Sequence, residues 1–222
     1  MDLSLEAPDH TTLSRRSSKL RVNLVAVQPK GPTHLIIDSS GLSIVGEGEW
    51  ASAKHGKHGW RKLHLGVDGG GQIVAQVLTD SGGDDAKTGL AIIKSAKGRL
   101  ATVTADAAYD TIAIYEAAKS KGARVVVLPV RSASVSKRGP TSSERDKTIR
   151  MVKKLGRREW KKESGYHRQG TVENAFFRYK AILGDKLHSR DLSAQKAEVA
   201  IGCKVLNRML DCGRPKSVAI AR

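Results

Sequence analysis

Aromatic residues, cysteines and long apolar runs are all scarce in this sequence. Aromatic side chains make up 4% of its 222 residues, so any core must be mainly aliphatic. The two cysteines, Cys203 and Cys212, have no second pair and no flanking histidine to complete a zinc site, which favours idle thiols in a reducing compartment. No run approaches the ~18 apolar residues needed to cross a bilayer, and residues 1–16 contain no apolar signal-peptide core. These absences predict a cytoplasmic globular protein with no membrane partner.

Acidic residues are also in the minority. The chain has 39 Lys and Arg against 22 Asp and Glu, a formal net charge of +17, and residues 141–190 alone carry 14 basic and 6 acidic side chains. A surplus of this size favours a polyanionic partner and points toward nucleic acid. A basic surface that serves only solubility, or one that binds an anionic membrane, is the alternative. The lack of an amphipathic apolar face argues against the membrane.

The order of apolar segments predicts an α/β fold. Apolar or alternating runs predict strands at 34–40, 60–70, 71–80, 100–110 and 124–130. Helical patterns cover 84–97, 111–122, 144–158, 172–184 and 193–210. A three-strand meander followed by strand–helix–strand units implies a mixed sheet with helices packed on its faces.

Three carboxylates occupy distinctive places in this order. Asp38 is expected to end the first strand, Asp106 to end the fourth, and Glu173 to lie in the first turn of a late helix. Functional sites in α/β sheets gather at the carboxyl ends of strands, so these acids are expected to converge. Like charges held together need a cation between them, and oxygen ligands suit magnesium or manganese. Two such ions ~4 Å apart can catalyse phosphoryl transfer.

Each acid also has a structural interpretation. Asp38 could begin a turn, Asp106 could be an ordinary strand-end residue, and the helix dipole could favour Glu173. The combination with a basic surface favours a metal site. Lys180 lies two helical turns after Glu173 on the same face, where it could contact a DNA phosphate or simply be a solvated lysine. The other acids fit helix-starting roles: Asp84, Asp85 and Asp110.

These residues resemble bacterial insertion-sequence transposases that have a DDE catalytic domain of ribonuclease-H-like fold. The resemblance runs from PDHTTLSRR (8–16) to NRM (207–209). Its specific parts are IIDSSGL (36–42), HGKHGWRKLHLGVD (55–68), TADAAYD (104–110) and YHRQGTVENAFFRYK (166–180). The last segment resembles the tyrosine–arginine–glutamate–lysine signature of these enzymes, with Tyr166, Glu173 and Lys180 in register. The family's arginine stands four residues before the glutamate, where this chain has Gln169, with Arg168 beside it.

The resemblance implies that the chain is an enzyme, a DDE transposase. Asp38, Asp106 and Glu173 would ligate two Mg²⁺ or Mn²⁺ ions, and the enzyme would cut insertion-sequence ends and direct the freed 3′-hydroxyl at target DNA. Its partner would be double-stranded DNA, both terminal inverted repeats and target, and a homodimer on the DNA is compatible with the resemblance. The side chains expected to contact DNA are Tyr166, Arg168, Lys180, His55, His58, Trp60, Arg61 and Lys62. For the last five, a solvated basic loop is an equal alternative.

The resemblance also suggests how the chain is divided. Residues 1–33 would be the remnant of an N-terminal helical, DNA-binding region, 34–210 the catalytic domain and 211–222 a tail. Because family members carry a longer helical region before the first aspartate, an N-terminally truncated copy is expected. Two other functions stay open: a DNA-binding relic without turnover, and a ribonuclease-H-like nuclease or resolvase, since fold alone does not choose function.

Overall fold

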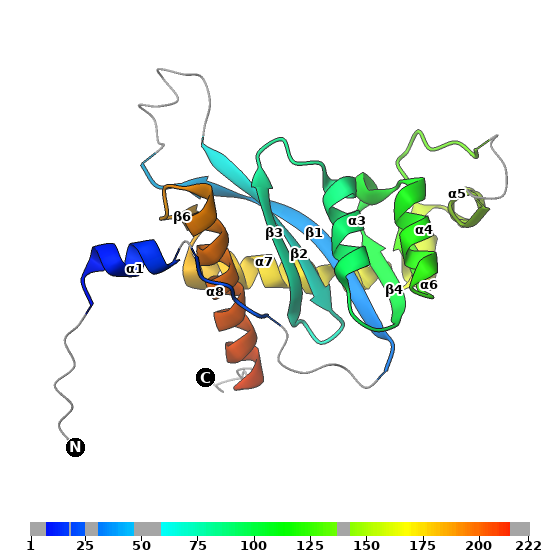
Figure 1. Ribbon diagram of the computed structural model, residues 1–222. Helices are drawn as coiled ribbons and strands as arrows, with labels where there is room; N and C mark the ends of the chain where they lie inside the picture. Colours follow the sequence, from blue (N-terminus) through cyan, green and yellow to red (C-terminus); the bar gives the residue numbers. More distant parts are fainter. Residues whose placement is uncertain (1–7, 18, 25–30, 47–58, 137–142, 214–222) are drawn as a thin grey trace, which may run out of the picture.

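The fold is built around one mixed β-sheet with helices on both faces (Figure 1). A computed structural model of the chain describes residues 8–17, 19–24, 31–46, 59–136 and 143–213. The strands are β1 (Thr33–Ile44), β2 (Trp60–Asp68), β3 (Ile73–Asp80), β4 (Leu100–Ala105), β5 (Arg124–Val127) and β6 (Lys186–Leu187). The α-helices are α1 (His10–Ser17), α3 (Asp85–Ser95), α4 (Ile112–Ser120), α5 (Ser143–Leu155), α6 (Arg157–Ser164), α7 (Gln169–Leu183) and α8 (Leu192–Asp211). Two short 3₁₀ helices are η1 (Ala107–Tyr109) and η3 (Tyr166–Arg168).

The strand order of the sheet is β3-β2-β1-β4-β5, with β6 paired to the far end of β1. β1, β2 and β3 form an antiparallel meander, and β4 and β5 continue the sheet parallel to β1. The helix α4 connects β4 to β5, as expected for a parallel pair. This arrangement confirms the predicted ribonuclease-H-like mixed sheet.

Alternation along β1 divides the core between the two faces of the sheet. Leu35 and Ile37 belong to the apolar cluster that includes residues of α3 and α4. Ile36 and Leu42 belong to the cluster that includes residues of α7 and α8. Because successive side chains of a strand point to opposite faces, Asp38 and Ser40 lie on the α7 face and Ser39 on the α3 face.

A third apolar cluster attaches α5 and α6 to the edge of the sheet. Val126 and Leu128 pack with Val152 of α5 and Trp160 of α6. Gly156 before α6 and Gly165 after it have φ angles of 80° and 78°, a region that favours glycine. These turns lead the chain directly into η3 and α7, the segment that carries the predicted signature.

Two predicted boundaries at the acids were wrong. β1 continues to Ile44 because its second half still pairs with β2 and β6, so Asp38 lies inside the strand and not at its end. α7 begins at Gln169, which places Glu173 in the second turn and removes its interpretation as a first-turn acid. The early start has a physical reason: the Gln169 side chain is buried and its amide donates to the Ile37 carbonyl, 3.3 Å away.

Asp110 also differs from its predicted role, because Thr111 is the residue that precedes α4 and Asp110 binds Arg145 of α5 instead. Cys203 is buried and Cys212 is exposed, and both thiols are free. Within the ranges that the structure describes, no helix is long and apolar enough to cross a membrane.

Candidate active site

The parallel pairing of β1 with β4 brings Asp38 and Asp106 together. The ladder pairs Ile37 with Ala105, so the two aspartates follow paired residues on neighbouring strands. β4 ends there, whereas β1 continues along β2. The Asp38 Oδ1 accepts a hydrogen bond from the Ser39 amide at 2.8 Å, and the Asp106 Oδ1 accepts one from the Ala108 amide at 2.9 Å. Both carboxylates are partly buried.

Glu173 reaches the same region from α7, which packs on β1 on the side that Asp38 faces. The pKa of Asp38 is raised from its usual value of 3.8 to about 6. Burial is the largest cause, and the charges of Asp106, Glu173 and Asp85 add to it against the opposing Ser39 hydrogen bond. Glu173 is exposed, yet it lies close enough to act on the Asp38 carboxylate.

Tyr166 lies within the electrostatic reach of all three predicted ligands. Its pKa is raised, first by burial and then by the charges of Asp106, Asp38 and Glu173. Its ring packs at a tilt against Trp160, with centroids 6.1 Å apart, and the Lys161 ammonium lies 5.1 Å from its centre. The predicted signature tyrosine therefore stands beside the site, anchored by α6.

None of the three predicted ligands has an ion-pair partner within the part of the chain that the structure describes. None of the ion pairs found there includes Asp38, Asp106 or Glu173. The pKa of Asp106 is raised, mainly by burial and further by Asp85, while its hydrogen bond to the Ala108 amide and the charge of Lys62 oppose the rise. Partly buried carboxylates without an ion-pair partner offer the hard oxygen donors that suit a divalent cation.

The side chains do not form a closed coordination cluster. In the described ranges, no group of three or more His, Cys, Asp or Glu side chains stands close enough to hold a metal ion. The donor chemistry, with the charges of Asp106 and Glu173 raising the pKa of Asp38, fits a divalent ion. The geometry shown is an open arrangement of two strand carboxylates with an exposed glutamate on the facing helix.

Two side chains predicted to contact DNA, Lys180 and Arg168, have polar partners on β1. The Lys180 ammonium donates to the Ser40 hydroxyl at 2.7 Å, on the face of β1 that carries Asp38. The Arg168 guanidinium lies against the ring of His34, with Nη1 2.6 and 2.8 Å from its two nitrogens. Lys180 thus stands near the acids, whereas Arg168 contacts the start of β1.

The predicted contacts on β2 are also engaged within the chain. Trp60 is 38% exposed and its ring covers Gly41, where an added Cβ would lie 3.3 Å from the ring. Arg61 forms an ion pair with Asp80 and its Nε donates to Gln195 at 2.9 Å. Lys62 pairs with Asp85 at 2.6 Å. The remaining two predicted contacts, His55 and His58, lie outside the described residues.

Asp85 is a residue near the site whose position the sequence did not reveal. It was expected to support the start of a helix, yet its carboxylate binds Ser39 and Lys62 on two central strands. One signal was present in the sequence: two consecutive acids, of which only one can be the N-cap of α3. Asp84 is that residue, accepting from the Lys87 amide at 2.9 Å.

Gln169 stands where the resemblance expected an arginine. It is 5% exposed, its amide binds β1, and its Oε1 has no hydrogen-bond partner among the described residues. The side chain therefore packs inside the fold and does not extend toward solvent.

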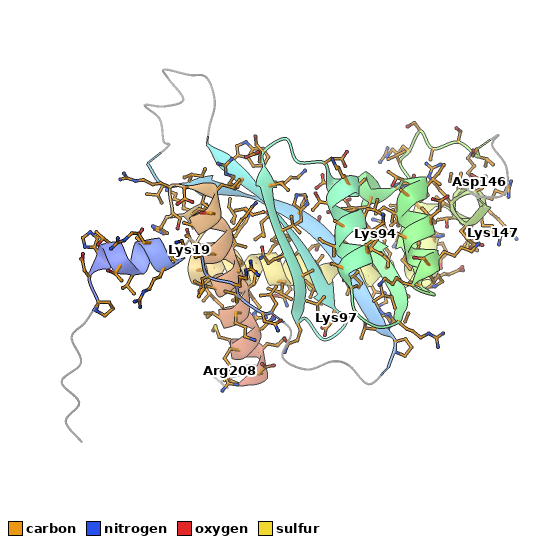
Figure 2. The ribbon with its side chains drawn as sticks, viewed as in Figure 1. Lys19, Lys94, Lys97, Asp146, Lys147 and Arg208 are labelled. Carbon is orange, nitrogen blue, oxygen red and sulfur yellow. The ribbon has the colours of Figure 1, made fainter. Side chains whose placement is uncertain are left out.

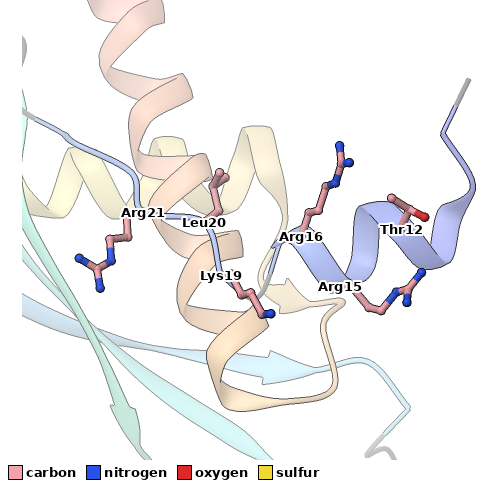
Figure 3. A pocket seen from close by; sticks show the side chains of 6 residues that line it. All are labelled: Thr12, Arg15, Arg16, Lys19, Leu20 and Arg21. Atoms are coloured by element: carbon pink, nitrogen blue, oxygen red, sulfur yellow. The ribbon is translucent and has the colours of Figure 1, made fainter.

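Two hollows among the described residues lie away from Asp38 and Asp106. One, of about 550 Å³, is lined by Thr12, Arg15, Arg16, Lys19, Leu20 and Arg21 (Figure 3). In that view Arg16 and Arg21 point in different directions, so the basic groups do not meet at one point. A second, of about 660 Å³, lies beside α7 and includes Thr171 and Asn174. Basic side chains such as Lys94, Lys147 and Arg208 lie on separate helices (Figure 2).

The strand order, with Asp38 on β1 and Asp106 directly after the neighbouring β4, is that of a ribonuclease-H-like domain. Two family models, both described as a transposase DDE domain, match the chain, one over residues 29–208 and the other over residues 1–47. Because the first match spans most of the chain, the chain belongs to the transposase DDE domain family. This confirms the family that the sequence motifs indicated.

Proposed function

We propose that this chain is a DNA transposase that cleaves DNA at the ends of an insertion sequence and joins the freed ends to target DNA. The observation that carries the proposal is the convergence of three carboxylates from β1, the end of β4 and α7. Their charges act on Asp38 and on Tyr166, and no described basic side chain pairs with any of them. Family membership supplies the class of enzyme.

Asp38, Asp106 and Glu173 are the residues that would hold the metal ions, two Mg²⁺ or Mn²⁺. Such ions, when bound, activate an attacking oxygen and stabilise the leaving oxygen of a phosphodiester. The chain prepares its ligands through the backbone: the Ser39 and Ala108 amides each bind the Oδ1 of one aspartate. Each Oδ2 stays available, because neither accepts a hydrogen bond within the described ranges.

Lys180 and Tyr166 are the residues best placed to hold DNA beside these acids. Among the described residues, the Lys180 ammonium binds a neutral hydroxyl and no acid, so a phosphate can replace Ser40 as its partner. Further phosphate contacts would come from the basic side chains of α1 and of the segment after it. These are Arg15, Arg16, Lys19 and Arg21. We propose that residues 34–210 form the catalytic domain and that 1–33 extend its DNA contacts.

The test uses purified protein and a supercoiled plasmid that carries the inverted repeats flanking the gene. In Mg²⁺ the wild-type protein is expected to nick and join the plasmid, and Asp106→Ala is expected to abolish both reactions. Glu116→Ala, which removes an exposed acid of α4, is the matched control and should behave as wild type. Cleavage that survives Asp106→Ala would refute the assignment.

A DNA-binding protein without turnover is the second candidate. Two observations favour it: no three carboxylates in the described ranges are grouped tightly enough to hold a metal ion, and Gln169 is buried where the family has an arginine. It predicts binding whose affinity falls steeply with salt and no cleavage in any divalent ion. RNA–DNA hybrids and four-way junctions in the same assay would reveal a ribonuclease or resolvase instead.

A further inference from the structure

The helix α3 carries an acid that contacts both central strands beside the candidate site. The Asp85 carboxylate accepts hydrogen bonds from the Ser39 hydroxyl at 2.7 Å and from the Lys62 ammonium at 2.6 Å. The buried ring of His64 lies 3.5 Å away. Ser39 directly follows Asp38 in β1, and Lys62 lies on β2. One side chain therefore joins α3 to the residue next to a predicted metal ligand.

This contact is not needed to start the helix. Asp84 already caps α3, and its carboxylate binds the Lys87 amide inside the same helix. The Asp85 side chain is only 20% exposed, and its hydrogen-bond partners are on the sheet. Two neighbouring acids thus have separate roles, one local and one directed at the strands.

One helical turn later, α3 also contacts the chain that follows Asp106. The ring of Tyr109 packs so closely on Gly89 that an added Cβ would lie 2.7 Å from two of its carbons. Tyr109 is 1% exposed and stands three residues after Asp106. Residues four apart share a helix face, so Asp85 and Gly89 present one surface to both segments that carry an aspartate of the site.

We propose that Asp85 is a positioning residue of the candidate site, which fixes the chain at Asp38 through Ser39 and holds the Lys62 ammonium close to the carboxylates. The inference rests on the proposed function. Its physical basis is that ligand groups need support from neighbouring hydrogen bonds to keep their geometry. Lys62 lies within electrostatic reach of Asp106.

The experiment compares Asp85→Ala with Asp84→Ala in the full chain. Mn²⁺ binding is measured by electron paramagnetic resonance in the absence of DNA, and nicking is measured as a function of Mg²⁺ concentration. Asp85→Ala is expected to raise the Mn²⁺ dissociation constant about tenfold or more and to lower the maximal nicking rate by about 10- to 100-fold. Asp84→Ala should lower the melting temperature and leave the Mn²⁺ affinity unchanged.

A second pair of variants keeps the proposal open to refutation if Asp85→Ala does not fold. Ser39→Ala removes one hydroxyl partner of Asp85, and Ser39→Thr retains it. The first should weaken Mn²⁺ binding and the second should restore it. The positioning role is overturned if Asp85→Ala, or Ser39→Ala in its place, binds Mn²⁺ as tightly as wild type. If the wild-type protein itself neither binds Mn²⁺ nor nicks DNA, the proposed function fails, and the role of Asp85 with it.

Discussion

Two groups of acids near the centre of the sheet differ in what balances their charge. Asp106 and Glu173 both act electrostatically on Asp38, and none of the three acids has an ion-pair partner among the described residues. Asp85 and Asp110, close by, are each paired with a basic side chain of the same chain. An acid with its own cation links elements of the fold, whereas the acids without one remain the predicted ligands of a metal ion.

The contrast is sharpest between Asp106 and Asp110, which flank η1. Asp110 is 1% exposed and accepts two hydrogen bonds from Arg145 of α5, at 2.8 and 2.7 Å. This bidentate contact is also the main reason that the pKa of Arg145 is raised. Within the described ranges, the Asp106 carboxylate accepts a hydrogen bond from the Ala108 amide and no other. The two aspartates are four residues apart, and only Asp110 forms an ion pair with α5.

The largest expected effect comes from neutralising an acid of the unpaired group. Glu173→Gln should reduce DNA cleavage by at least about a thousandfold, on the order of 4 kcal/mol of transition-state stabilisation. Because Glu173 is exposed, the melting temperature should not fall. Cleavage rates and thermal melts check this, with Glu163→Gln as the same change at an exposed glutamate of α6. Equal activity of the two variants would remove Glu173 from the site.

The second expected effect is a loss of folding stability when an ion-paired acid, Asp110, is removed. Asp110→Ala leaves the partly buried Arg145 without its carboxylate and should lower the free energy of unfolding by about 3 kcal/mol. Asp106→Ala, four residues earlier, should lower the free energy of unfolding far less. Urea unfolding measures both, and adding Arg145→Met to Asp110→Ala should recover part of the loss. The comparison breaks down if Asp106→Ala destabilises the protein as much as Asp110→Ala.

The sequence was sufficient for the fold, because the fold follows from local patterns. The choice of Asp38, Asp106 and Glu173 as metal ligands stays a prediction. Alternation and turn residues located the meander, and the apolar runs before Asp38 and Asp106 placed them on central strands. The β1 boundary was wrong because its extension depends on pairing with β2 and β6, which no local pattern shows. Likewise, α7 starts early because Gln169 binds a carbonyl of a distant strand.

Partners of charged side chains were the part that could not be predicted. Asp85 and Asp110 both occupy positions typical of helix starts, and a short-range pattern assigns them to caps. Their actual partners, Lys62 and Arg145, are 23 and 35 residues away in the sequence. Such pairings follow from the way elements pack, so the distinction between paired and unpaired acids needs the three-dimensional arrangement.

The raised pKa of Asp38 makes the stability of the protein depend on pH. The folded protein holds a proton on this carboxylate up to about pH 6, whereas the unfolded chain releases it near 3.8. The folded state therefore binds more protons between these values, so this group makes the metal-free protein less stable as pH rises from about 4 to about 6. Asp38→Asn should remove this loss and raise the stability at pH 7 by on the order of 1 kcal/mol, after allowance for solvent screening.

Urea unfolding in EDTA at pH 5 and pH 7 tests this directly. The difference between Asp38→Asn and wild type should be larger at pH 7, and Mn²⁺ should stabilise wild type but not the variant. The asparagine can still accept the Ser39 amide hydrogen bond, so the comparison isolates the charge. A variant that is less stable than wild type at pH 7 would contradict an uncompensated acid at this position.

The smallest expected effect is on DNA affinity, and it distinguishes two lysines, of which one has an ion-pair partner and the other does not. Lys62 is paired with Asp85, whereas Lys180 binds the neutral hydroxyl of Ser40. Lys180→Met should therefore weaken DNA binding and reduce the slope of log affinity against log salt by about 0.9, the loss of one phosphate contact. Lys62→Met should leave the slope unchanged, because its charge is already balanced within the protein. Filter binding between roughly 50 and 200 mM salt, a range over which the affinity for DNA falls steeply, measures both slopes. Equal slopes for the two variants would show that an internal ion pair does not decide which lysine meets DNA.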